Sequence, residues 1–221
     1  RECFMAKLEL TEEIRELYTS SARGVEMVDV PLFNFIMIDG QLEDGTNRTT
    51  SDSFQDALNA LNGISFTLKF ISKLNRKNPI DYNTMPLEGL WHPSGKNDFK
   101  NRSGWKWTLM MMQPEHISTD MFEDAVSSLR KKRSGISALK LARFEPFHEG
   151  SAVQIMHVSS PGLVPMTIER IKNYARKEKY QLGEPYHEIY LSDPRHTKPE
   201  KQRTILRYPI KIISGSKKEG K

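Results

Sequence analysis

The residues most suited to chemistry lie near the C-terminal end, in the segment PYHEIYLSDPR from Pro185 to Arg195. Read as a strand, this segment places Tyr186, Glu188 and Tyr190 on one face of a sheet, because successive side chains point to opposite faces. A buried glutamate is costly unless it is paired or hydrogen-bonded, and two phenols supply flat walls with hydroxyl groups at their tips. The pattern is typical of a pocket for an aromatic, cationic or reactive small molecule. By itself it fits equally well an exposed sheet face with a solvated glutamate.

The alternate residues of the same segment, His187, Ile189 and Leu191, fit an ordinary core face. No serine or cysteine stands near a histidine in a recognisable nucleophile context, so a hydrolytic triad is not supported. His157, at the end of another apolar segment, is more typical of a hydrogen-bonded structural histidine than of a catalytic one.

Composition describes a folded protein that is expected in the cytoplasm. The chain has 221 residues, 37% of them hydrophobic and 28% charged, as in globular domains. It holds no apolar run of the roughly 20 residues that span a bilayer, and its first residues, RECFMAKLELTEEI, contain no apolar signal region. The single cysteine, Cys3, cannot form an internal disulfide, and no Cys/His cluster suggests a metal. We therefore expect a reducing compartment, no membrane contact, no metal and no cofactor.

The net charge of +5 raises the question of nucleic-acid binding. Basic runs occur at Arg130–Arg133 and in the tail SGSKKEGK, but neither run contains interleaved aromatic residues. No helix-turn-helix, zinc-finger or RNA-binding motif is present. We therefore expect solvated helix and tail ends and no specific nucleic-acid partner.

Apolar periodicity and breaker residues predict an alternation of helices and strands. The first helix is expected within Ala6 to Tyr18, and a long helix begins at Ser51 or Ser53, with apolar positions three and four residues apart. A third helix begins at Ser118 and Thr119, and Pro161 and Pro165 open a fourth. The expected strands are Val28 to Ile38, Met85 to His92, Trp105 to Met112, Leu139 to Phe147, Ser151 to Val158, Tyr186 to Leu191 and Thr204 to Ile213.

The order of these elements repeats within the chain. Residues 28–112 and 151–213 each read as strand, helix, strand and strand, and each copy carries a central carboxylate, Glu88 or Glu188. This predicts an α+β fold of two similar halves about a pseudo-two-fold axis, with the helices on one side and a ligand groove between the halves. The sheet faces away from the helices can form that groove, and both glutamates are candidates to line it. The domain organisation follows as a helical segment 1–27, a binding domain 28–213 and a basic tail 214–221.

Four motifs resemble the GyrI-like small-molecule-binding proteins, in particular their stand-alone branch. They are DYNTMPLEGLW, WKWTLMMMQP, FEPFHEGSAVQIMHV and HEIYLSDPR with the later KPEKQRTILRYPI. The resemblance runs from about Met5 to Ile210. It implies a tandem strand–helix–strand–strand fold with an aromatic groove and an acidic residue in it. One departure stands after Val158, where relatives commonly show a Gly-Pro-Tyr turn followed by an acidic pair and this chain has SSPGLVP.

The resemblance also assigns site residues. The acidic groove residue falls on Glu188, with Tyr190 beside it as a second candidate catalytic residue. The family's aromatic groove residues fall on Trp91, Trp105, Trp107 and Tyr186, although Trp105 and Trp107 fit a helix-packed core stripe equally well. Apart from the resemblance, Glu88, Phe35 and Met156 are further candidate ligand-binding residues; a surface position for Glu88 and a core position for Met156 are the alternatives. The strand parity of Trp91 is opposite to that of Glu88, so the two cannot share a sheet face without a bulge.

Relatives of this kind are effector-binding modules of multidrug-responsive regulators, gyrase inhibitors, or hydrolases that open the cyclopropane ring of DNA-alkylating natural products. The leading expectation is binding of hydrophobic aromatic, cationic or electrophilic small molecules, with cyclopropane hydrolysis as a detoxification reaction. The alternative is a non-enzymatic module that sequesters drugs, or that acts on a gyrase or with a separate regulator. Both an enzyme and a binding module are compatible with this sequence.

Overall fold

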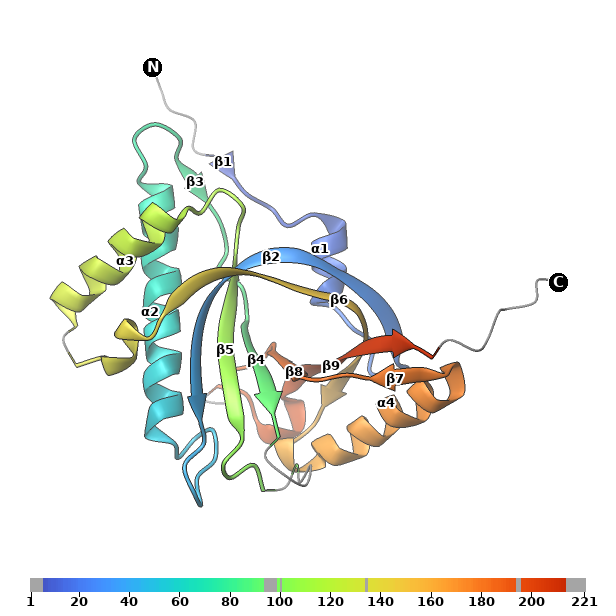
Figure 1. The fold of residues 1–221 in the computed structure, drawn as a ribbon. Coiled ribbons are helices and arrows are strands. Elements are labelled where there is room, and N and C mark those ends of the chain that lie inside the picture. Colours follow the sequence, from blue (N-terminus) through green and yellow to red (C-terminus); the bar gives the residue numbers. More distant parts are fainter. Residues whose placement is uncertain (1–5, 94–98, 100, 134, 194–195, 214–221) are drawn as a thin grey trace.

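The structure of the chain, a computed structural model, describes residues 6–93, 99, 101–133, 135–193 and 196–213. Cys3 and the basic tail 214–221 lie outside the described residues. Six strands, all paired antiparallel, close into a barrel (Figure 1). In order around the barrel they are β2 (Glu26–Gln41), β5 (Lys106–Gln113), β4 (Leu87–His92), β8 (Tyr186–Tyr190), β9 (Arg203–Ile212) and β6 (Arg143–Val158). The pairing of β6 with both β9 and β2 closes the circle.

The barrel consists of two halves with the same connectivity, as the repeat in the sequence predicts. The first half is β2, α2 (Asp52–Lys73), β4 and β5, and the second is β6, α4 (Val164–Glu178), β8 and β9. The first strands of the halves pair with each other, and so do their second strands, which is the relation that a pseudo-two-fold axis produces. The α+β fold of two repeats is thereby confirmed.

Short elements complete the fold. The helices α1 (Glu12–Leu17) and α3 (Thr119–Lys132) lie outside the repeats, and 3₁₀ turns occupy Ser137–Lys140, Pro161–Leu163 and Pro199–Lys201. The strands β1 (Ala6–Lys7) and β3 (Ile80–Asp81) form a parallel pair, and β7 (Tyr180–Leu182) pairs with the end of β9. In Figure 1, β2 and β6 arch over the other strands, with α2 and α3 on one side and α4 on the other. No helix among the described residues is long and apolar enough to cross a bilayer.

The structure decides between the two helix caps that the sequence left open and changes one strand boundary. Ser51, and not Ser53, begins the long helix, because its hydroxyl accepts a hydrogen bond from the backbone of Phe54 at 3.2 Å. The strands expected on either side of Gly150 are one continuous strand of 16 residues, β6, which starts at Arg143. Gly150 adopts a φ of 70°, and the register between β6 and β2 is the same on both sides of it.

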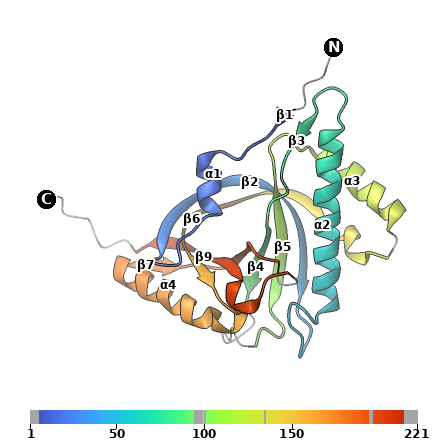
Figure 2. The same cartoon turned by 180° about the vertical axis from the view of Figure 1, so that it is seen from behind.

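The sheet has a helix-facing side and an interior side. On the helix-facing side, the apolar stripe of α2 predicted from its spacing packs against Trp91, Trp107 and Leu109, and Ile168 and Ile171 of α4 join the same core. The interior holds a methionine-rich cluster made of Phe35, Met37, Met85, Leu90, Met110 and Met112. Residues of α1 pack against this interior cluster, and Figure 2 shows α1 on the near side of the barrel when it is viewed from behind.

Candidate functional site

Glu188 lies in the middle of β8 between the two tyrosines that the alternation predicts. The hydroxyl of Tyr186 donates a hydrogen bond to Oε1 of Glu188 at 2.7 Å, and that of Tyr190 donates to Oε2 at 2.7 Å. The side chain of Glu188 is 2% exposed. A solvated glutamate on a wet sheet face is therefore excluded, and the carboxylate is buried and hydrogen-bonded.

Two arginines from connecting segments form ion pairs with this carboxylate and stabilise its negative charge. Arg102, ahead of β5, places Nη2 2.6 Å from Oε1 of Glu188, and Arg48, ahead of α2, places Nη1 3.5 Å from Oε2. Burial alone would raise the pKa of Glu188, but the two guanidinium groups and the hydrogen bonds hold it well below its usual range. Glu188 is therefore an ionised carboxylate at neutral pH.

Aromatic rings surround the Arg102 guanidinium. Its central carbon lies 4.9 Å from the ring centroid of Trp91, 5.4 Å from Trp105, 5.7 Å from Phe99 and 5.8 Å from Tyr186. These distances are in the range of cation–π attraction. We call the group formed by Glu188, Arg102, Arg48, Tyr186, Tyr190, Trp91, Trp105 and Phe99 the Glu188 cluster.

Gly89 makes room for this cluster on the neighbouring strand. It pairs directly with Glu188. A Cβ atom at position 89 would come within 3.1 Å of both Nε1 of Trp91 and the hydroxyl of Tyr190. Those two groups are hydrogen-bonded to each other at 3.0 Å. A glycine here lets the indole and the phenol meet beside the carboxylate.

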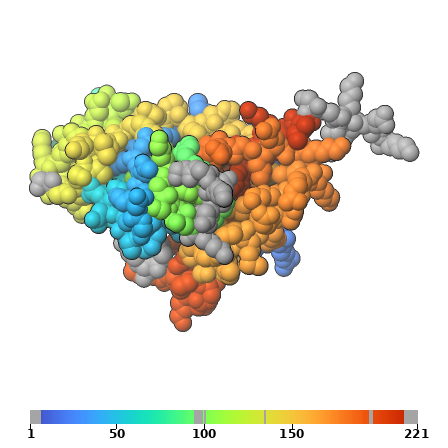
Figure 3. Space-filling view, turned by 60° about the horizontal axis from the view of Figure 1, so that its bottom comes forward, coloured from blue at the N-terminus to red at the C-terminus, as the bar shows by residue number. Residues whose placement is uncertain are grey.

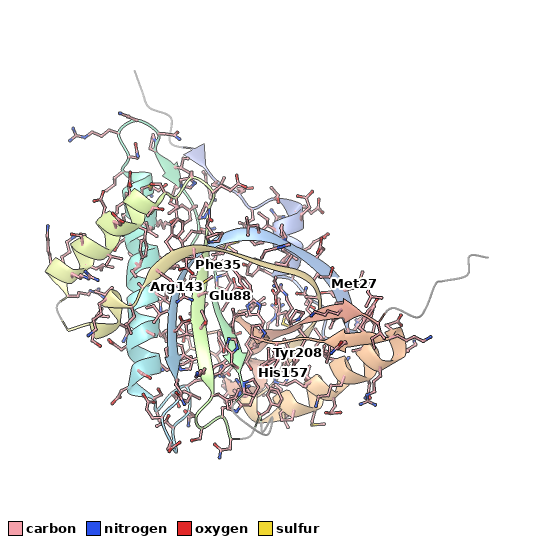
Figure 4. All side chains as sticks on the ribbon, viewed as in Figure 1. Met27, Phe35, Glu88, Arg143, His157 and Tyr208 are labelled. Carbon is pink, nitrogen blue, oxygen red and sulfur yellow. The ribbon has the colours of Figure 1, made fainter. Side chains whose placement is uncertain are left out.

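The candidate residues named from the sequence divide between the two sides of the sheet. Tyr186, Tyr190, Trp91 and Trp105 are brought together with Glu188. Trp107 shares that side, but it packs edge-on against Phe54 in the core beneath α2. Glu88, Phe35 and Met156 lie on the interior side, and Figure 4 shows Glu88 and Phe35 within the arch of β2 and β6.

The expected groove with both glutamates in it is therefore wrong in two respects. Glu88 pairs with Ile189, one position out of step with Glu188, so the two carboxylates point to opposite sides of the sheet. Glu188 is also on the side where α2 and α4 pack, not on the side away from the helices. The repeat places Gly89, and not Glu88, on the face of β4 that corresponds to Glu188.

Sequence reasoning missed Arg102, Arg48 and Phe99. All three stand in polar connecting segments without periodicity, so no strand or helix pattern points to them. The expected burial of Glu188 was the one signal that could have pointed to them, because a buried carboxylate requires a cation or several hydrogen-bond donors nearby. In Figure 3, which brings the bottom of Figure 1 forward, green residues from the middle of the chain lie between blue residues of the first half and orange residues of the second half.

The interior side holds a second buried ionic network, where an ordinary core face was expected. The ring of His187 lies between two carboxylates, with Nε2 3.0 Å from Glu88 and Nδ1 3.0 Å from Glu149. Arg207 reaches Glu149 at 3.0 Å. The hydroxyl of Tyr18, from the end of α1, donates to Glu88 at 2.7 Å. Burial opposes the charge on His187, but the two carboxylates prevail and raise its pKa to about 9.

His187 and Glu149 are therefore both charged at neutral pH. Burial disfavours the ionised form of Glu149, but the ion pairs with His187 and Arg207 lower its pKa to about 2. The space around this network is about 10 Å³, which leaves no room for a ligand. The network fastens α1 to the barrel through Tyr18 and through the carbonyl of Leu17, which accepts a hydrogen bond from Arg207 at 2.8 Å.

A larger cavity, of about 530 Å³, opens beside α1 and the end of β5. Its walls include Ile14, Phe33, Met85 and Met112, with Asn83 at the edge. None of the three charged groups of the Glu188 cluster lines it. This cavity therefore lacks the buried carboxylate and the two paired arginines of the Glu188 cluster. Among the described residues, no three His, Cys, Asp or Glu side chains are grouped as metal ligands.

No protein-family model matches the chain, and none of the curated proteins does. Solved structures match it along nearly its whole length. An uncharacterized conserved protein from Listeria innocua is 31% identical, with a TM-score of 0.81, 93% of this chain covered and 100% of that one. A hydrolase from Listeria innocua is also 31% identical, with a TM-score of 0.80, 94% of this chain covered and 100% of that one.

The C-terminal domain of EcmrR is 9% identical, with a TM-score of 0.52, 86% of this chain covered and 98% of that domain. This likeness concerns the fold alone. The two Listeria proteins are 31% identical to this chain over their full length, which is enough to show a common family. The chain therefore belongs to the same family as these two proteins.

Proposed function

We propose that the protein is a GyrI-like small-molecule-binding protein that takes hydrophobic aromatic electrophiles at the Glu188 cluster and hydrolyses them, with a strained cyclopropane ring as the reacting group. The observation that carries the proposal is the buried, ionised carboxylate of Glu188 between two phenols and several aromatic rings. The family relationship to a Listeria innocua protein described as a hydrolase supports it.

The reaction would add one water molecule across a ring bond. The water oxygen bonds to the methylene carbon of a cyclopropane fused to a dienone, and the strained carbon–carbon bond breaks. Its electron pair moves through the dienone to the carbonyl oxygen, which becomes a phenolate and takes up the proton that water releases. Ring strain and the aromaticity of the product supply driving force.

Glu188 would orient the attacking water and stabilise the positive charge that develops on it. Because its pKa lies well below the usual range, it is a weak proton acceptor, and its contribution is electrostatic and geometric more than that of a strong base. Tyr190 would donate a hydrogen bond to the water or to the developing phenolate. Trp91 already donates to the Tyr190 hydroxyl at 3.0 Å, which fixes the direction of that phenol.

Entry of a ligand requires movement of side chains on the connecting segments. Glu188 is covered by Arg102 and Arg48, whose side chains are 12% and 28% exposed. These arginines and Phe99 stand outside the strands, so they can shift without breaking the barrel's hydrogen bonds. The tyrosines and Trp91 are held by β8 and β4 and would form the fixed part of the site.

A binding function without catalysis is the second candidate, and one observation favours it. The ion pairs that keep Glu188 charged also weaken it as a base. A protein that sequesters drugs, inhibits a gyrase or serves a separate regulator would need the aromatic walls but no turnover.

The test is incubation with a cyclopropane-bearing duocarmycin-type compound, with mass spectrometry to detect the product that has gained one water. We expect turnover in the wild type, a loss of about 100-fold or more in Glu188→Gln, the scale of a lost electrostatic stabiliser of the transition state, and retained binding. Asn83→Trp, which fills the edge of the other cavity, serves as the control and should leave turnover unchanged. Tight binding without any product would contradict hydrolysis of that substrate, and inhibition in a DNA-gyrase supercoiling assay would then support the binding function.

A further inference from the structure

The charge balance of the Glu188 cluster is positive. One carboxylate faces two guanidinium groups, at 2.6 Å from Arg102 and 3.5 Å from Arg48. The phenols of Tyr186 and Tyr190 are neutral, because burial raises the pKa of each. The three charged side chains therefore sum to +1, and a ligand that enters with its own positive charge would be repelled by the excess guanidinium.

The place of a cation is also already occupied. A flat organic cation would bind by lying over the aromatic faces close to the carboxylate. In the structure the Arg102 guanidinium does this, with four aromatic ring centroids within 5.8 Å and a carboxylate oxygen at 2.6 Å. A cationic ligand would have to displace the Arg102 guanidinium, and the contacts of this group with the aromatic rings and with Glu188 would be lost.

Arg102 also carries an unused donor. Its Nη1 is buried and has no hydrogen-bond partner among the residues that the structure describes. A buried donor without a partner is costly, and the cost is removed by any acceptor that reaches it. A carbonyl oxygen is such an acceptor, and hydrogen bonds from a charged guanidinium are stronger than those between neutral groups.

We propose that the Glu188 cluster selects uncharged flat aromatic compounds that carry a carbonyl acceptor, and that Arg102 sets this specificity by donating Nη1–H to the carbonyl and by excluding organic cations. The inference rests on the proposed function, and it restricts the ligands to those aromatic compounds that are uncharged and carry a ketone. Arg102 is a specificity-determining residue in this account. It would also place a positive charge beside the oxygen on which negative charge develops during ring opening.

The test compares two tricyclic probes of nearly the same shape, N-methylacridone, which is neutral and carries a ketone, and N-methylacridinium, which is cationic and lacks it. Fluorescence titration gives the Kd of each for the wild type, Arg102→Met and Arg102→Lys. The control variant is Arg143→Met, which removes an arginine that is paired with Asp39 on the other side of the sheet. Thermal melting identifies any variant that has lost its fold.

We expect the wild type to bind the acridone at least about 10-fold more tightly than the acridinium. Arg102→Met should reverse this order, with about 10-fold weaker binding of the ketone and about 10-fold tighter binding of the cation, on the scale of a hydrogen bond to a charged group. If Arg102→Met does not fold, Arg102→Lys takes its place, and we expect that variant to bind the acridone more tightly than the acridinium, as the wild type does. Arg143→Met should leave both Kd values unchanged.

Equal or tighter binding of the acridinium by the wild type would overturn the inference and leave the proposed binding function standing. Loss of the ketone's advantage in Arg143→Met as well would also overturn it, because the effect would then be one of net charge alone. If neither probe binds to the folded wild type or to folded Arg102→Met, both the inference and the proposed function fail.

Discussion

The ionic network inside the barrel makes a sharp prediction about stability and pH. His187 is 1% exposed and its pKa is raised from an ordinary value of 6.5 to about 9 by Glu149 and Glu88. A group whose pKa is raised in the folded state stabilises that state fully below the unfolded pKa and ceases to do so as the pH rises through the folded one. A shift of this size corresponds to about 3 kcal/mol.

The free energy of unfolding of the wild type should therefore fall by about 3 kcal/mol between pH 6 and pH 9.5. In His187→Gln the side chain cannot titrate. That variant should be less stable at pH 6 by roughly 3–5 kcal/mol, the cost of breaking a buried ion pair, and nearly independent of pH over the same range. The buried tyrosines lose their protons above this range because burial raises the pKa of Tyr18 and of Tyr186.

Urea denaturation followed by tryptophan fluorescence at pH 6, 7.5, 8.5 and 9.5 measures both curves. Parallel curves for the wild type and for His187→Gln would contradict this prediction, because the pH dependence would then belong to other groups. A wild-type stability that rises from pH 6 to pH 9.5 would give the wrong sign and would mean that His187 is buried in its neutral form.

Two further predictions concern packing around the two networks. In Gly89→Ala the new methyl group would meet Nε1 of Trp91 and the hydroxyl of Tyr190 at 3.1 Å; we expect a loss of about 1–3 kcal/mol in the free energy of unfolding and weaker ligand binding, whereas Gly24→Ala, with open space around it, should cost little. Tyr18→Phe removes the hydroxyl that donates to a buried carboxylate at 2.7 Å; it should cost about 1–3 kcal/mol and increase hydrogen exchange in α1. Unchanged denaturation curves for either variant would show that the contact it removes or crowds contributes nothing to stability.

The architecture was accessible from the sequence because each half contains its own local signals. The spacing of apolar residues after Ser51 predicted the buried stripe of α2, and the repeated order of elements predicted two halves related by a pseudo-two-fold axis. Alternation within Tyr186–Tyr190 correctly grouped both tyrosines with Glu188. These features depend on neighbours close in sequence, and period-2 and period-3.6 patterns record them directly.

The arrangement of the Glu188 cluster was less accessible, because it depends on register between distant strands and on side chains of irregular segments. A shift of one residue between β4 and β8 decides whether Glu88 or Gly89 shares a face with Glu188, and matching the two copies by their carboxylates gave the wrong choice. Arg48 and Arg102 come from connecting segments 140 and 86 residues away from Glu188 in sequence. No local pattern encodes such pairs.

His187 was assigned to an ordinary core for a related reason. Its strand neighbours are apolar, and its partners Glu88 and Glu149 belong to β4 and β6, which lie far from β8 in the sequence. A histidine alternating with apolar residues fits a core equally well when those partners are not known.

In proposing this reaction we claim that it depends on Glu188. The decisive measurement is the single-turnover rate of water addition to a cyclopropane-bearing substrate, compared between the wild type and Glu188→Gln at equal saturation. We expect a rate about 100-fold or more lower in the variant, with substrate still bound and with a cooperative thermal transition that shows a folded protein. An equal rate in the folded variant would contradict the claim and would move the search for the reacting group away from β8.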